Sequence, residues 1–142
     1  EGRILLIEHK TRDLLWRPEL TVHPNGARGL TEVVIAVADV DATADRYARL
    51  LGVPSVRAGA ARTIRLERGR CTLVSPDRLG EILPGAAAPA VPFIAGLRIE
   101  VADLAATAGV LERTGVPFQH ADGRLVVAAA EAGGATCVFS TA

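Results

Sequence analysis

The stretch EVVIAVADVDATADRYARLLG at residues 32–52 recurs in altered form as LRIEVADLAATAGVLERTGVPF at residues 97–118. Identical residues occupy matching places in the two stretches: Ile35 and Ile99, Val37 and Val101, Ala38-Asp39 and Ala102-Asp103, Ala42-Thr43-Ala44 and Ala106-Thr107-Ala108, Arg49 and Arg113. The alignment then drops one residue, so that Gly-Val-Pro at 52–54 meets Gly-Val-Pro at 115–117. This internal repeat predicts that the chain contains two copies of one structural unit.

Each copy opens with the local signals of a strand followed by a helix. Runs rich in β-branched residues at 30–37 and 97–101 predict strands. An Ala-Asp pair ends each run, and the carboxylate of Asp39 or Asp103 can accept hydrogen bonds from the first free N–H groups of a helix. Apolar residues then recur with the helical period. A strand and a capped helix are therefore expected at the start of each copy.

The end of each predicted helix also has a local sequence signal. Gly52 and Gly115 follow the last periodic residue, and a proline stands two residues further on, which is typical of a helix C-terminus. Short extended segments follow, at 55–57, 62–67 and 71–75 in the first copy and at 118–121, 124–129 and 136–141 in the second. The pattern predicts β-α-β-β-β, twice.

These elements define the expected organisation as one compact α+β domain. Two tandem βαβββ modules should form curved mixed sheets with their helices outside, preceded by a leader strand over residues 3–8. The expected boundaries are a leader at 1–28, the first module at 29–75, a linker at 76–95 with one helical turn near 79–82, and the second module at 96–142.

Composition narrows the class of protein. The formal net charge of the 142 residues is zero, so the chain has no basic field for nucleic acid. No apolar run approaches the roughly 20 residues that span a bilayer, so no membrane association is expected. Cys71 and Cys137 stand far apart and suggest no disulfide framework, which favours a cytoplasmic location. The chain has no methionine, which we interpret as processing or as a fragment of a longer protein.

The two quoted stretches resemble the opening strand and helix of modules in the vicinal-oxygen-chelate superfamily, which includes glyoxalases, bleomycin-resistance proteins and dioxygenases. The resemblance covers residues 30–75 and 96–141 and specifies the fold better than the reaction. The leader IEHKTRDLLWRPELTVHPNGA, residues 7–27, is similar to the connector between two module pairs in longer glyoxalase-like proteins. The resemblance thus implies the C-terminal module pair of such a protein, with a missing N-terminal pair or a second copy in a homodimer as its partner.

The resemblance also implies a divalent metal held by His or Glu side chains from the first and last strand of each module, where it polarises vicinal oxygens of a substrate. Glu32 occupies the first-strand position, but Gly96 stands at its counterpart. The last-strand positions at 73–74 and 138–139 are apolar. Since a metal site needs several converging ligands, we expect none and no cofactor. A divalent ion would need further ligands, for which His9 and His23 are the weak candidates.

Charged residues are expected on the concave side of the module pair, here called the cup. Strand alternation places Glu32 there, and in the second copy it places Gly96, Arg98 and Glu100 there. Arg65, on a neighbouring strand, could extend the charged patch. Two interpretations stay open: mutually paired charges in a solvated groove, or a site where Arg98 binds a small organic acid.

The resulting hypothesis is a glyoxalase-like domain without its own metal site, which serves as the structural or substrate-covering part of a larger or oligomeric protein. One alternative is a metal-dependent lyase, isomerase or dioxygenase completed by a partner chain. Another is a small-molecule-sequestering protein like the bleomycin-resistance proteins, although one Trp, one Tyr and three Phe are few aromatics for such a cup. Whether the chain is an enzyme, and on which substrate, stays open.

Overall fold

The computed structural model describes residues 4, 5 and 7–142. Its centre is one eight-stranded mixed sheet in the order β2-β3-β4-β1-β5-β8-β7-β6. The strands are β1 (Ala27–Ala36), β2 (Ser55–Ala58), β3 (Ala61–Arg65), β4 (Arg70–Val74), β5 (Phe93–Val101), β6 (Gln119–Ala121), β7 (Arg124–Val127) and β8 (Thr136–Ser140). The main helices are α2 (Val40–Leu51) and α4 (Leu104–Arg113).

Strand pairing repeats in the two halves. β1 pairs in parallel with β4, and β5 pairs in parallel with β8, while β2-β3-β4 and β6-β7-β8 are antiparallel meanders. An antiparallel pairing of β1 with β5 joins the halves. The predicted α+β fold of two βαβββ modules is confirmed, and the two modules share one continuous sheet.

The helices begin and end as the capping residues predict. The Asp39 carboxylate accepts a hydrogen bond from the N–H of Ala42 at 2.9 Å, and the Asp103 carboxylate accepts one from the N–H of Ala105 at 2.8 Å. Gly52 ends α2 in the left-handed region, with φ of 68°. Each cap satisfies backbone groups that a bare helix end would leave unpaired.

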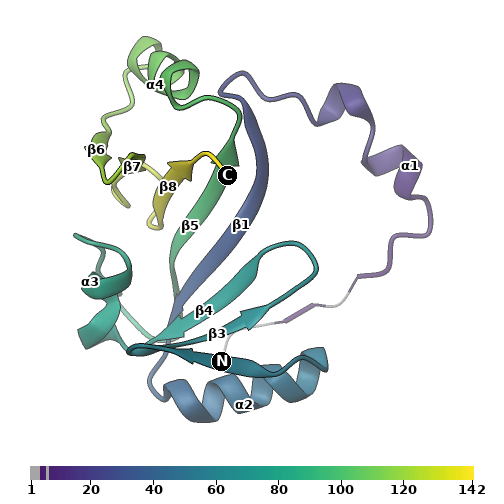
Figure 1. Cartoon of the computed structure of the whole chain (residues 1–142), viewed down its shortest axis with the longest axis vertical. Coiled ribbons are helices and arrows are strands. Elements are labelled where there is room, and N and C mark those ends of the chain that lie inside the picture. Colours follow the sequence, from purple (N-terminus) through teal and green to yellow (C-terminus); the bar gives the residue numbers. More distant parts are fainter. Residues whose placement is uncertain (1–3, 6) are drawn as a thin grey trace.

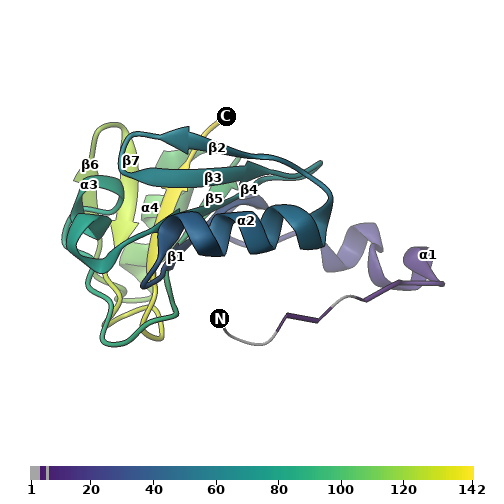
Figure 2. The ribbon, with the colours of Figure 1, turned by 90° about the horizontal axis from the view of Figure 1, so that it is seen from below.

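The sheet is curved so that its two arms, β2-β3-β4 and β8-β7-β6, face each other across the cup (Figure 1). α2 lies against the outer face of the first arm, as Figure 2 shows from below. Two apolar clusters fix the helices to the sheet: Val37, Ala44, Cys71 and Leu73 under α2, and Val101, Leu111, Leu125, Val127 and Phe139 under α4. The cup is therefore the sheet face that the two long helices leave free.

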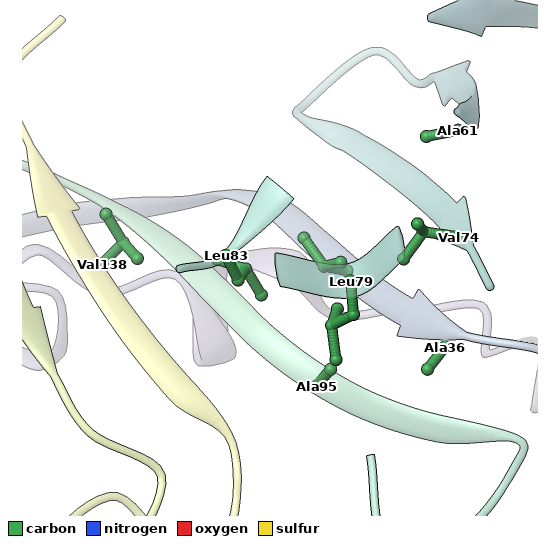
Figure 3. Close-up of a cluster of buried hydrophobic side chains, with 8 residues drawn as sticks. Ala36, Ala61, Val74, Leu79, Leu83, Ala95 and Val138 are labelled. Atoms are coloured by element: carbon green, nitrogen blue, oxygen red, sulfur yellow. The ribbon is translucent and has the colours of Figure 1, made fainter. Parts of the chain in front are cut away.

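The linker between the modules enters the cup. It forms the 3-10 turn η2 (Pro76–Arg78) and the single-turn helix α3 (Leu79–Ile82), as the sequence predicted for 79–82. Leu79 and Leu83 are fully buried and lie between Val74 on β4 and Val138 on β8 (Figure 3). The linker thus closes one end of the cup with an apolar core of its own.

The leader departs from the prediction. It contains the turns α1 (Arg12–Leu15) and η1 (Pro18–Leu20), and it runs away from the sheet (Figures 1 and 2). No strand includes the described residues of the expected leader strand, which are Ile4, Leu5, Ile7 and Glu8. Arg3 and Leu6 lie outside the described residues. Alternation alone is a weak signal for a strand here, because a strand also needs hydrogen-bond partners, and the described residues Ile4, Leu5, Ile7 and Glu8 pair with no strand of the sheet.

No helix in residues 4, 5 and 7–142 combines the length and the apolar character needed to cross a membrane.

Candidate binding site

Glu32 lies at the centre of the cup, with a side chain that is only 4% exposed. Arg70 Nη2 donates a hydrogen bond to Glu32 Oε2 at 2.8 Å, and Thr72 Oγ1 donates one to Oε1 at 2.5 Å. Arg98 Nε lies 2.8 Å from Oε2, too poorly aligned for a hydrogen bond but close enough for an ion pair. Both oxygens of the carboxylate are therefore engaged by side chains of this chain.

The sheet pairing brings these partners together. Glu32 on β1 stands opposite Arg70 on β4 and opposite Arg98 on β5. Alternation along β4 then turns Thr72 to the same face. The Glu32–Arg98 contact consequently connects one module to the other.

The pKa values of Glu32 and Arg98 are both lowered, for different reasons. Burial alone would raise the pKa of the Glu32 carboxyl, but the hydrogen bonds from Arg70 and Thr72 and the charges of Arg98 and Arg70 outweigh it and lower that pKa. Burial lowers the pKa of Arg98, Glu32 opposes that effect, and the nearby charges of Arg124 and Arg70 add to it. Arg98 is therefore a partly desolvated cation with other cations around it.

An open cleft of about 410 Å³, here called the arginine cleft, surrounds this group. Four arginines line it: Arg65 from β3, Arg70 from β4, Arg98 from β5 and Arg124 from β7. Glu32, Glu81 and Asp122 are the acidic residues of its wall. Glu81 already pairs with Arg78, whose Nε lies 2.5 Å from Glu81 Oε1.

Within the described residues, two of these four arginines keep all of their donors free. Arg65 and Arg124 make no ion pair or hydrogen bond through their side chains with any described residue. Arg98 Nη2 donates to the carbonyl of Ile82 at 3.1 Å, while its Nη1 has no partner in the described part of the chain. The cleft can therefore offer guanidinium donors from both arms of the sheet to one anion.

These residues do not fit the divalent metal that the fold suggests. Glu32 is the only acidic side chain at an expected ligand position, and two arginines and a threonine engage it. A side chain at Gly96 would begin 2.4 Å from Leu83 Cδ1, so the linker fills the space of a second ligand. Val74 and Val138 are buried in the apolar cluster at the closed end of the cup. Within the described residues, no three His, Cys, Asp or Glu side chains gather as a metal-binding group.

The other candidates from the sequence have separate surroundings. Glu100 is half-buried on β5 opposite Gly29 and Ser140 and does not join the Glu32 group. His9 is exposed in the leader, and His23 Nδ1 lies 2.6 Å from Asn25 Oδ1 in a turn. Glu100 lies further along β5, forms no ion pair with described residues and does not line the arginine cleft, so its place in the expected trio stays a prediction.

Sequence reasoning did not identify Arg70, Thr72 and Arg124. For the last strand of the first module it selected 73–74, but Leu73 faces α2. Alternation backwards from Val74 would have placed Thr72 and Arg70 in the cup, and the same rule applied to β7 separates Arg124 and Val126 from the buried Leu125 and Val127. That signal was present, but using it required the strand limits to be known to one residue.

Neither cysteine provides a nucleophile for the cleft. Burial, helped by the charge of Glu32, raises the pKa of the Cys71 thiol to about 11. Burial also raises the pKa of Cys137. Both thiols stay protonated near neutral pH, as the interpretation of both as strand residues without thiolate chemistry expects.

Comparison with solved structures supports the architecture. A methylmalonyl-CoA epimerase from Mycobacterium tuberculosis superposes with a TM-score of 0.58 at 22% identity, over 85% of this chain and 93% of that one. The chain has the glyoxalase-like fold. A variant methylmalonyl-CoA epimerase of Streptomyces coelicolor in complex with 2-nitronate-propionyl-CoA gives 0.52 at 18% identity, over 80% and 97% of the two chains. The hypothetical protein BH1468 from Bacillus halodurans gives 0.55 at 13% identity, over 80% and 94%.

At these identities the glyoxalase-like fold is what the chain and the three structures share. No family model and no curated protein matches the sequence. The likeness to the methylmalonyl-CoA epimerases concerns the fold alone. The activity of this glyoxalase-like chain has to be inferred from its own cup.

Proposed function

We propose that this chain is a metal-independent glyoxalase-like module whose cup holds a small organic acid, as the substrate-covering part of a larger or oligomeric protein. The observation that carries the proposal is the set of free guanidinium donors in the arginine cleft. Arg65 and Arg124 come from opposite arms of the sheet and line one cleft, and neither has an acidic partner among the described residues. Guanidinium groups bind carboxylates strongly because their planar N–H groups match the two oxygens.

Register explains why an anion would be stabilised there. Arg65 stands directly opposite Arg70 across β3 and β4, and like charges at such positions repel. Glu32 compensates the charge of Arg70, whereas no described residue forms an ion pair with Arg65. A bound carboxylate would supply the missing negative charge without competing for Glu32.

A metal-dependent lyase, isomerase or dioxygenase is the less favoured function. A partner chain could bring further ligands, but it would also have to release Glu32 from Arg70, Thr72 and Arg98. Breaking such a buried group leaves charges without partners, which is costly. A variant methylmalonyl-CoA epimerase of Streptomyces coelicolor with the same fold forms a complex with 2-nitronate-propionyl-CoA, an organic ligand.

The test is calorimetric titration with a panel of monocarboxylic and dicarboxylic acids, at low salt and with a chelator present. We expect binding to the wild type. Arg65→Gln and Arg124→Gln should each weaken it about tenfold, since one charge-assisted hydrogen bond contributes about 1.5 kcal/mol. Neither arginine forms an ion pair in the described structure, so both variants should keep the wild-type melting temperature.

Arg49→Gln is the matched control, because Arg49 is exposed on α2, outside the cup, and its removal should leave affinity unchanged. Failure of every acid to bind would refute the proposal. So would binding that occurs only after a divalent ion replaces the chelator.

A further inference from the structure

A second hollow adjoins the arginine cleft. It has a volume of about 90 Å³ and is here called the pouch; Leu83, Val126, Thr136 and Val138 line it, with Gln119 and Ala121 on the β6 side. Arg98, Arg124 and Asp122 belong to the walls of both the pouch and the cleft, so the two spaces meet at the guanidinium groups. A ligand held by Arg98 and Arg124 could therefore extend into the pouch.

The floor of the pouch is apolar and buried. Leu83 and Val138 are 1% and 5% exposed, and both belong to the apolar cluster at the closed end of the cup. Val126 packs against that cluster and is half-buried. Thr136 is the polar residue of the floor, and its hydroxyl makes no hydrogen bond with the described residues. Such a surface favours an alkyl group over a second charge, because an unpaired charge is costly to bury.

The size of the pouch limits that alkyl group. A cavity of about 150 Å³ lined by apolar side chains is enough for benzene. At about 90 Å³ the pouch is smaller, so we expect it to fit a short or branched chain of a few carbons better than an aromatic ring. Leu83 sets this limit from one side, where the linker enters the cup.

We infer that the ligand is a small organic acid with a compact aliphatic tail, whose carboxylate is held in the arginine cleft and whose tail passes Arg98 and Arg124 to fill the pouch. The inference rests on the proposed function for its charged end. It adds that the pouch selects the tail by volume, through Leu83, Val126 and Val138. Asp122, at the shared rim, disfavours acids that carry a second carboxylate on the tail.

The test is a series of acids with one constant head: acetate, propionate, 2-methylpropanoate, 3-methylbutanoate, hexanoate and benzoate, each titrated into the full chain. We expect affinity to rise about fourfold for each buried methylene up to the branched acids. It should then fall for hexanoate and benzoate, which exceed the pouch. Ala121→Phe narrows the mouth from an exposed position on β6, so it should remove the gain in affinity from acetate to the branched acids.

The outcomes separate the two proposals. Equal affinity for all six acids would refute selection by the pouch but not carboxylate binding by the arginine cleft. If none of the six acids binds, both proposals are refuted. If Ala121→Phe lowers the melting temperature, the acid series is titrated into Val126→Phe instead, which fills the same space from β7. Retention of the tail preference in a folded variant of either kind would also overturn the inference.

Discussion

Glu32 stands where the family resemblance implies a metal ligand, but in the structure it is the centre of an ion-pair group. Its side chain is almost fully buried, and it receives a hydrogen bond from Arg70, another from Thr72 and the charge of Arg98. Burying a carboxylate is unfavourable unless partners of this kind surround it. The same contacts that make Glu32 tolerable in the cup remove it from metal binding.

Glu32→Gln should therefore destabilise the fold by about 3 kcal/mol at neutral pH, because it leaves Arg98 and Arg70 without their counter-charge. The folded-state pKa of Glu32 is lowered from 4.5, so its contribution is present above about pH 4.5 and is lost as the pH falls through the lowered value. The difference in unfolding free energy between wild type and variant should be constant from about pH 6 to 8 and shrink below pH 4.5.

Chemical denaturation across that pH range measures this difference. Glu112→Gln is the control, since Glu112 is exposed on α4 and forms no ion pair with described residues. A Glu32→Gln variant as stable as the wild type at pH 7 would show that the ion-pair group contributes nothing to the fold.

At the scale of elements, the short linker has more influence on the cup than its four-residue helix suggests. α3 is too short to be stable alone. It is held because Leu79 and Leu83 are fully buried among side chains of β1, β4, β5 and β8. This arrangement explains Gly96, since only a residue without a Cβ leaves room for Leu83 Cδ1.

Leu83→Ala should cost about 3 kcal/mol of unfolding free energy, as is usual for a leucine removed from a core. Gly96→Ala should also destabilise, because its Cβ would lie 2.4 Å from Leu83 Cδ1 and 3.0 Å from the Thr136 carbonyl oxygen. In the double variant the first of these clashes is gone. We expect the loss of unfolding free energy in the double variant to be about 1 kcal/mol smaller than the sum of the losses in the two single variants.

Denaturant titration of the two single variants and the double variant measures this coupling. The control is the same set of variants with Gly29→Ala in place of Gly96→Ala. Since a Cβ at Gly29 meets no atom within 4 Å, its effect should add to that of Leu83→Ala. Strict additivity of Gly96→Ala and Leu83→Ala would mean that Leu83 moves aside freely and does not limit the cup.

At the scale of the whole molecule, the compact body contrasts with its leader. Large apolar side chains of the leader are exposed, among them Leu5 and Ile7 at 71% and Trp16 at 64%. Apolar residues gathered on an exposed segment usually mark a contact with another protein surface. They support the proposal that the module works within a larger or oligomeric protein, with a second copy of this chain as the simplest partner.

We expect the chain to dimerise at tens of micromolar and a Leu15→Glu/Trp16→Glu double variant to be monomeric, because charges in the leader oppose burial of that segment. Sedimentation velocity distinguishes the monomer from the dimer in both proteins. Lys10→Glu is the control, being an exposed charged residue of the same segment. A wild-type monomer, or a double variant that still dimerises, would contradict the expectation.

The sequence by itself determined the units of this protein. The repeat, the caps at Asp39 and Asp103 and the glycine that ends α2 are local signals, since each depends on hydrogen bonds and periodicity within a few residues. Alternation also placed Glu32 and Arg98 in the cup correctly. Arg65 was expected only as a residue of a neighbouring strand that could extend the patch, and it lines the arginine cleft.

Only the tertiary structure decided what the cup contains. Glu32 meets Arg70 and Thr72 across 38 and 40 residues of chain, and those pairings depend on which strands lie side by side and in what register. A shift of one residue would turn every one of these side chains to the opposite face. The entry of Leu79 and Leu83 between the arms likewise depends on the curvature of the whole sheet, which no local pattern encodes.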